Sequence, residues 1–193
     1  MRDTGLASLG YFYVDFRDRA KQEARGLLSS LLVQLCVQSD RFCTILSSLH
    51  ETHDRGHEEP SEDELAECLK EMLRDPEQAP VFIMVDALDE CPNSQGLPPP
   101  RERALKIMKE LIEINLPHLH FCITSRSEID IRVFLDPLVQ EPNSVSLHDQ
   151  PGQIEDIAEY INSIVNSDTK MEEWSKELKK QVIDTLAKKS SGM

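Results

Sequence analysis

The stretch Val81–Glu90 reads VFIMVDALDE, and it decides the fold of this 193-residue chain. It begins with a continuous apolar run after Pro80, which is too short for a helix and typical of a strand covered on both faces. Asp86 ends the run, and Asp89 and Glu90 follow. Three carboxylates at one strand end repel each other unless a cation or hydrogen-bond donors offset their charge. Mg²⁺ is the natural candidate, since it prefers carboxylate oxygens, retained water and substrate phosphates.

The residues on either side of this strand alternate between strand and helix patterns. Apolar, aromatic and β-branched runs predict further strands at Tyr11–Phe16, Leu119–Thr124 and Ser144–Leu147. Apolar residues at helical spacing predict helices over about Ala24–Gln38, Ser61–Leu73, Arg101–Asn115, Glu128–Leu135, Gln153–Asn166 and Met171–Lys189. The second of these begins with a capping-box pattern, Ser61 followed three positions later by Glu64. This alternation predicts an α/β fold with a mainly parallel sheet, whose ligands bind beyond the carboxyl ends of the strands.

The predicted strand Leu119–Thr124 ends in residues that suit a phosphate ligand. Thr124 and Ser125 offer hydroxyl groups, and Arg126 offers a guanidinium that makes fork-shaped contacts with phosphate. Acids on one strand end with an arginine on another would form a Mg²⁺–phosphate site with opposite charges in place. The alternative is that Arg126 only neutralises the neighbouring acids.

The net charge narrows the classes of ligand and location. Asp and Glu number 35 and Lys and Arg number 21, so the net charge is −14. This excess argues against general binding of nucleic acid or of a membrane surface, because both are negatively charged. No apolar run reaches the roughly 18 residues of a membrane span, and the first ten residues, MRDTGLASLG, contain no apolar signal core. We therefore expect a cytoplasmic protein.

The cysteines and histidines give weaker signals. The five cysteines are odd in number and no pair has CxxC spacing, so we expect reduced, mostly packed thiols, and neither a disulfide framework nor a zinc knuckle. His50, His53 and His57 lie in a polar segment where nothing closes a tetrahedral set of ligands. Metal binding by these histidines is the less favoured alternative.

VDALDE followed by ITSR resembles the NACHT module of STAND-class P-loop NTPases, and most of all the fungal, NLR-like NACHT proteins that often carry C-terminal repeats. The blocks that carry the resemblance run through nearly the whole chain, at Tyr11–Asp18, Leu27–Leu35, Pro80–Pro92, Leu119–Arg132 and Val145–Asp149. The resemblance implies a P-loop NTPase-like three-layer α/β/α fold. It assigns residues 1–150 to a partial nucleotide-binding core and residues 151–193 to a helical extension that is cut short at its C-terminus.

The resemblance also implies a role for each residue that matches a family motif. Asp86 would hold Mg²⁺ through water, and either Asp89 or Glu90 would activate the attacking water. Arg126 would report the γ-phosphate, with Thr124 and Ser125 beside it at the nucleotide. The implied cofactors are Mg²⁺ and ATP or GTP. Phosphoryl transfer depends on positioning and charge neutralisation, and these residues suit both tasks.

One departure from the family is decisive, because the P-loop pattern GxxxxGK[ST] is absent. Only Gly5 and Gly10 have the required separation, and Tyr11 follows Gly10 where the pattern needs Lys. The loop lies upstream of the Tyr11–Phe16 strand in the family, so we expect that the chain begins after it and lacks the central Walker A strand. The phosphate cradle would then be missing, and nucleotide binding and hydrolysis weak or lost. The Leu119–Thr124 strand would lack a neighbour and expose an edge that favours association.

Several functions therefore remain open. The first is a fragment of a NACHT signalling NTPase that acts as a Mg²⁺–nucleotide switch, with nucleotide and protein partners or self-association. The second is a non-catalytic interaction or regulatory protein, in which the acidic helical surface matters and the strand-end residues are inherited. The third is a non-functional gene fragment. An unrelated metal phosphotransferase would need another nucleophile or phosphate cradle, which the sequence does not offer.

Overall fold

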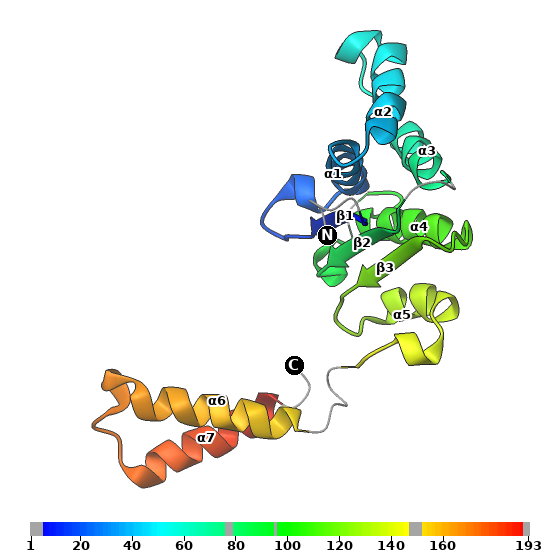
Figure 1. The fold of residues 1–193 in the computed structure, drawn as a ribbon. Coiled ribbons are helices and arrows are strands. Elements are labelled where there is room, and N and C mark those ends of the chain that lie inside the picture. Colours follow the sequence, from blue (N-terminus) through cyan, green and yellow to red (C-terminus); the bar gives the residue numbers. More distant parts are fainter. Residues whose placement is uncertain (1–5, 76–78, 95, 147–151, 191–193) are drawn as a thin grey trace. The chain divides into compact units, whose positions relative to one another are not determined.

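The computed structural model describes residues 6–75, 79–94, 96–146 and 152–190, which form two compact units, residues 1–139 and 140–193 (Figure 1). The described part of the first unit holds a parallel sheet with the strand order β1 (Ser8–Tyr13), β2 (Val81–Asp86) and β3 (Leu119–Ile123). The α/β class and the parallel sheet predicted from the sequence are confirmed. Tyr13 pairs with Asp86, and Val85 pairs with Ile123, so the three carboxyl ends lie together at one edge of the sheet.

One face of this sheet is covered and the other is exposed. Val81, Ile83 and Val85 are buried, whereas the alternate side chains of Phe82 and Met84 are 41% and 38% exposed. Successive side chains of a strand point to opposite faces, so the prediction that β2 is covered on both faces is wrong. The aromatic side chains of Tyr11 and Tyr13 on β1 are exposed in the same alternating manner.

The described helices of the first unit are α1 (Ala24–Cys36), α2 (Asp40–Thr52), α3 (Glu62–Leu73), α4 (Pro100–Glu113) and α5 (Ile129–Leu135). The buried faces of α1, α3 and α4 form one core with the covered face of the sheet. The capping box of α3 is present as predicted, since the Ser61 N–H donates to Glu64 (2.7 Å) and the Glu64 N–H donates to the Ser61 hydroxyl (3.2 Å). Helix α2 was not among the helices predicted from the sequence.

The end of β1 differs from the prediction of a strand over Tyr11–Phe16. The strand ends at Tyr13, because the chain then enters a turn in which the Asp18 N–H donates to the Asp15 carbonyl (3.0 Å). The Asp18 side chain also accepts from the Ala20 N–H (3.1 Å) and starts the short 3-10 helix η2 (Arg19–Lys21). Short polar side chains that bond nearby backbone compete with a strand ladder, and here they end it.

The outer edge of β1 is covered by two glutamine side chains, Gln34 in α1 and Gln38 in the turn after it. The Gln34 amide accepts from the Tyr11 N–H (3.1 Å) and donates to the Tyr11 carbonyl (2.7 Å). Gln38, one helical turn later, makes the same pair of bonds with Leu9, at 2.9 and 2.8 Å. The two side-chain amides therefore occupy backbone groups that would otherwise be open to another strand. Within the described residues, β3 pairs only with β2.

The described part of the second unit is a pair of packed helices, α6 (Gln153–Ser167) and α7 (Lys176–Ser190). Helix α7 begins later than the predicted Met171, because Asp168 caps a 3-10 turn, η8 (Thr169–Met171), before it. The apolar side chains of Leu178 and Leu186 on α7 are exposed. No helix in the part of the chain that the structure describes is long and apolar enough to cross a membrane.

The fourth predicted strand is not present where the structure describes it. Residues 144–146 are irregular and exposed, and no described strand pairs with them. A strand needs a partner's hydrogen-bond ladder, so this part of the prediction is wrong. Leu147 lies outside the described residues.

Candidate functional site

The candidate site lies at the carboxyl edge of the sheet, where the chain leaves all three strands. After β2, Ala87 adopts a left-handed conformation (φ 58°), and the 3-10 turn η4 (Leu88–Glu90) buries Leu88. The Leu88 N–H donates to the Thr124 carbonyl (3.1 Å), and the Thr124 N–H donates to the Val85 carbonyl (2.9 Å). These bonds fix the acidic loop after β2 against the end of β3.

Thr124 orients the first acid of the site. Its hydroxyl donates to Oδ1 of Asp86 and accepts from the Ala87 N–H (3.1 Å). Asp86 and Thr124 therefore form one unit across neighbouring strand ends, as their positions in the sequence predicted. The Thr124 hydroxyl bonds only Oδ1 of Asp86 and does not bond Oδ2.

Asp89 and Arg126 form a second link between the same two strand ends. The Arg126 N–H donates to Oδ1 of Asp89 (2.9 Å), and the guanidinium Nε lies 3.4 Å from Oδ2. The Asp89 side chain is only 11% exposed, whereas that of Arg126 is 84% exposed. The neutralising role that the sequence left open for Arg126 is therefore present, and its guanidinium is also in solvent. The Ser125 hydroxyl donates to the Arg126 carbonyl (2.8 Å). Among the described hydrogen bonds, it makes none to the side chain of another candidate residue.

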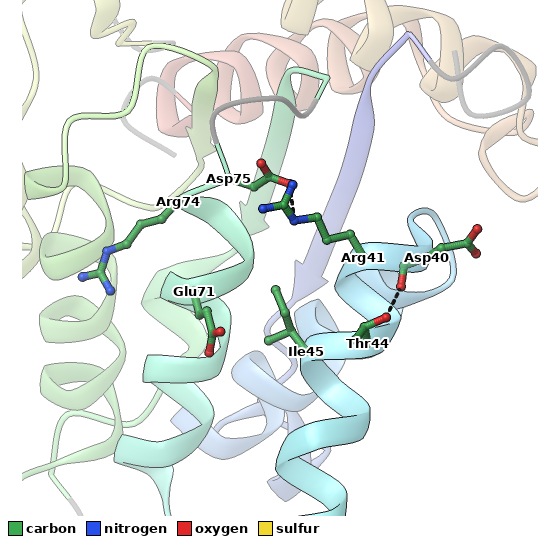
Figure 2. A pocket seen from close by; sticks show the side chains of 7 residues that line it. All are labelled: Asp40, Arg41, Thr44, Ile45, Glu71, Arg74 and Asp75. Atoms are coloured by element: carbon green, nitrogen blue, oxygen red, sulfur yellow. Dashed lines mark hydrogen bonds and ion pairs between the residues drawn. The ribbon is translucent and has the colours of Figure 1, made fainter.

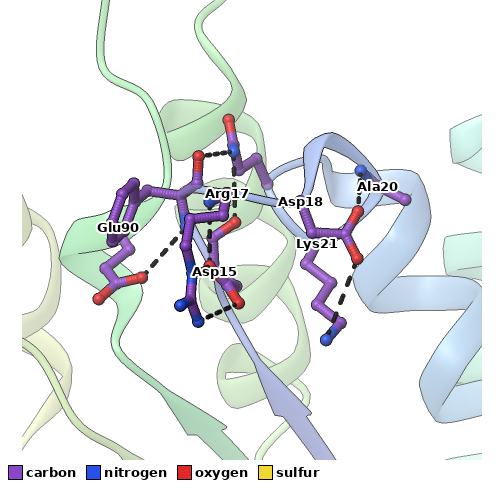
Figure 3. Close-up of polar contacts among 8 residues, drawn as sticks. Asp15, Arg17, Asp18, Ala20, Lys21 and Glu90 are labelled. Carbon is purple, nitrogen blue, oxygen red and sulfur yellow. Dashed lines mark hydrogen bonds and ion pairs between the residues drawn. The ribbon is translucent and has the colours of Figure 1, made fainter.

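The third acid, Glu90, faces the loop that follows β1 (Figure 3). Its Oε2 accepts a hydrogen bond from the Phe16 N–H (3.1 Å). In the same loop Arg17 holds the Asp15 carboxylate with two side-chain bonds of 2.9 and 3.0 Å. This contact with Arg17 lowers the pKa of Asp15 to about 2. Gln22 closes the loop by donating to the carbonyls of Asp15 (3.2 Å) and Phe16 (2.6 Å).

Each acid of the Val81–Glu90 stretch thus has its own donor. Hydroxyl or N–H groups offset the repulsion that the sequence indicated, and the three carboxylates do not converge on one point. No group of three or more His, Cys, Asp or Glu side chains among residues 6–75, 79–94, 96–146 and 152–190 is placed to hold a metal ion. Mg²⁺ usually keeps several waters and uses one or two carboxylates, so Mg²⁺ binding through Asp86 stays a prediction.

Arg101 is a central residue of this region that sequence reasoning missed. Its buried side chain donates to the carbonyls of Cys91 (Nε, 2.8 Å) and Asp89 (Nη2, 2.5 Å) and to the Asp130 carboxylate (Nη1, 3.1 and 3.3 Å). It therefore ties the acidic loop after β2 to the start of α5. The signal in the sequence is that Arg101 follows Pro100 in the first turn of a helix, where the helix dipole disfavours a cation unless acceptors surround it.

An open hollow of about 560 Å³ lies between α2 and α3, away from the strand ends (Figure 2). Arg41 on its α2 side pairs with the buried carboxylate of Asp75 on its α3 side (2.9 Å). By contrast, the cavity beneath the end of β2, next to Leu88 and Cys91, measures only about 10 Å³. The hollow contains none of the predicted site residues, and the small cavity has no room for a nucleotide. The residues that line the hollow are Asp40, Arg41, Thr44, Ile45, Glu71, Arg74 and Asp75.

Comparison with protein families matches residues 1–126 to the N-terminal region of nephrocystin 3. The matched range holds all three strands and the strand ends described above, through Arg126. No curated protein and no solved structure matches the chain. The matched family is only loosely related to NACHT-containing proteins, so the predicted relationship is supported in a coarser form. Because the matched residues make up well over half of its length, the chain belongs to the nephrocystin 3 N-terminal family.

Proposed function

We propose that the chain is part of a cytoplasmic signalling NTPase of the NACHT type, in which Mg²⁺ with ATP or GTP at the carboxyl edge of the sheet acts as a switch. One observation carries the proposal: Asp86 at the end of β2 contacts Thr124 just after β3, and Asp89 in the following turn contacts Arg126. A carboxylate, a hydroxyl and a solvent-exposed guanidinium at adjacent parallel strand ends are the groups that a Mg²⁺–phosphate ligand needs.

The contacts also support different roles for the two acids after Asp86. Asp89 is mostly covered and already accepts from Arg126. Glu90 accepts one bond, from the Phe16 N–H of another loop. Glu90 is therefore the better candidate to position the attacking water, and Asp89 holds Arg126 in place. Ser125 is the least supported of the proposed nucleotide ligands, since its hydroxyl is bonded to the adjacent backbone.

We expect weak nucleotide binding and slow or no hydrolysis by these 193 residues alone. The sequence has no GxxxxGK[ST], so no loop of backbone N–H groups and no P-loop lysine hold the phosphates.

The melting temperature with and without Mg²⁺–ATP tests this proposal. We expect a small rise for the present chain and a clear rise for one joined upstream to a strand, GxxxxGK[ST] loop and helix, because a ligand at 100 times its Kd stabilises by about 2.7 kcal/mol. Asp86→Asn should remove the rise, whereas Asp184→Asn, an exposed acid on α7, should leave it unchanged. Equal rises for the two chains would contradict the proposal.

A non-catalytic interaction protein is the second candidate. It is favoured by the internal donors that each strand-end acid already has, and by the exposed apolar side chains of Phe82, Met84 and Tyr11 on the open face of the sheet. Large exposed apolar patches mark interaction surfaces. On this account Asp86→Asn leaves partner binding or self-association unchanged, and Met84→Lys weakens it.

A further inference from the structure

The turn between α1 and α2 brings two cysteines together. Cys36 is the last residue of α1, and Cys43 lies in the first turns of α2, after the N-cap Ser39. The Ser39 N–H donates to the Cys36 carbonyl (3.4 Å), and the Cys43 N–H donates to the Ser39 carbonyl (3.0 Å). These two backbone steps fold Cys43 back toward Cys36, and burial together with the neighbouring Cys43 thiol raises the pKa of Cys36.

The two thiols differ in their access to solvent. Cys43 is exposed and Cys36 is half-buried. A third thiol, Cys68 of α3, lies close enough to Cys36 to interact with its charge, but it is buried, and burial raises its pKa to about 11. A buried, protonated thiol is inert, since the thiolate is the reactive form. An oxidant therefore reaches the exposed Cys43 first, and the half-buried Cys36 beside it is more accessible than the buried Cys68.

We propose that Cys36 and Cys43 are a redox modification site, in which oxidation by a peroxide joins the two thiols in a reversible disulfide. The Cys43 sulfur attacks one oxygen of hydrogen peroxide, the O–O bond breaks, and a sulfenic acid and one water form. The Cys36 sulfur then attacks the Cys43 sulfur, the S–S bond forms, and the sulfenic hydroxyl leaves with a proton as a second water. Two thiols are oxidised and one peroxide is reduced to two waters. A dithiol reductant reverses the reaction by thiol–disulfide exchange.

The disulfide would connect two parts of the first unit that meet different neighbours. Helix α1 packs on the covered face of the sheet, whereas the start of α2 lines the hollow of Figure 2 through Asp40, Arg41 and Thr44. Oxidation would therefore fix the α2 side of the hollow to the sheet layer. This inference does not depend on nucleotide binding.

Peptide mapping of the whole folded chain tests the proposal. Trypsin cleaves after Arg25, Arg41 and Arg55, so each of the five cysteines falls in a different peptide. After mild treatment with hydrogen peroxide we expect residues 26–41 to be linked to residues 42–55, and five titratable thiols to fall to three. Dithiothreitol should restore five thiols. Absence of this link, or a dominant link to another cysteine or between chains, would overturn the proposal.

Serine variants provide the controls. Cys43→Ser should abolish the link, and because this side chain is exposed the variant should fold. Cys122→Ser removes an exposed cysteine on β3 and should leave the link intact. In concentrated urea the same peroxide treatment should lose its preference for the Cys36–Cys43 pair, since the folded turn holds the thiols together. A link that forms equally well in urea would contradict the geometric argument.

Discussion

Replacing Arg101 tests the contact that holds the acidic loop in place. The guanidinium donates to the carbonyls of Asp89 and Cys91 and to the carboxylate of Asp130, and its side chain is only 9% exposed. Arg101→Met keeps much of the apolar stem and removes all of these donors. Two carbonyls lose their partner at about 1 kcal/mol each. Asp130, which is about one-third exposed, loses an ion pair worth about 1 kcal/mol. We therefore expect the free energy of unfolding to fall by about 3 kcal/mol.

Hydrogen exchange of the β2 amides is the suitable assay. The single tryptophan, Trp174, lies in the second unit, so its fluorescence does not report on the sheet. A loss of about 3 kcal/mol should speed exchange of the most protected β2 amides about a hundredfold. Arg101→Lys should lie between wild type and Arg101→Met, because a single ammonium cannot reach all the acceptors that the guanidinium fork reaches.

Lys106→Met is the matched control, on the same helix α4. Lys106 is exposed and lies 3.9 Å from Glu110, so its loss should change stability by no more than about 0.5 kcal/mol. If exchange in Arg101→Met rises less than about fivefold, or no more than in Lys106→Met, then Arg101 does not hold the loop in the way described.

Three further predictions concern local contacts. Gln34→Ala should uncover the Tyr11 backbone groups. We expect the free energy of unfolding measured in urea to fall by about 1 kcal/mol and self-association measured by light scattering to increase. Unchanged scattering would argue against the covering of the β1 edge by Gln34. Ser61→Ala should cost about 1 kcal/mol in the same urea assay through loss of the α3 cap, and a neutral result would contradict that role. Arg17→Gln should raise the pKa of Asp15 from about 2 toward 3.8. In the wild type the lowered pKa contributes stability that is present above pH 3.8 and is lost as the pH falls toward 2, and the variant should lack this contribution. NMR titration of Asp15 checks this, and an unshifted pKa would rule out Arg17 as the cause.

The sequence predicted best where a signal is local. The apolar run predicted strand β2, and the Ser61–Glu64 capping box predicted the start of α3. The structure confirms both. The end of β1 and the start of α7 were predicted wrongly because Asp15, Asp18 and Asp168 make turns with nearby backbone, and such bonds override an apolar or helical pattern.

The meeting of Asp86 with Thr124 was predictable from topology, because the carboxyl ends of neighbouring parallel strands share one edge. The individual partners were not predictable in this way. Glu90 receives its donor from Phe16, 74 positions away, and Arg101 links two separate segments, the loop after β2 and the start of α5. These contacts depend on how loops of different strands pack, and no spacing within one loop contains that information.

The most direct test of the proposed nucleotide edge is an NMR titration of the isotope-labelled chain with Mg²⁺–ATP. We predict weak but saturable shifts of the amides of Asp86, Thr124 and Arg126, which together form the carboxyl edge. These shifts should be absent with ATP and no Mg²⁺, and lost in Asp86→Asn. Shifts confined to the hollow between Arg41 and Asp75, or no shift at the strand ends at any attainable concentration, would contradict it.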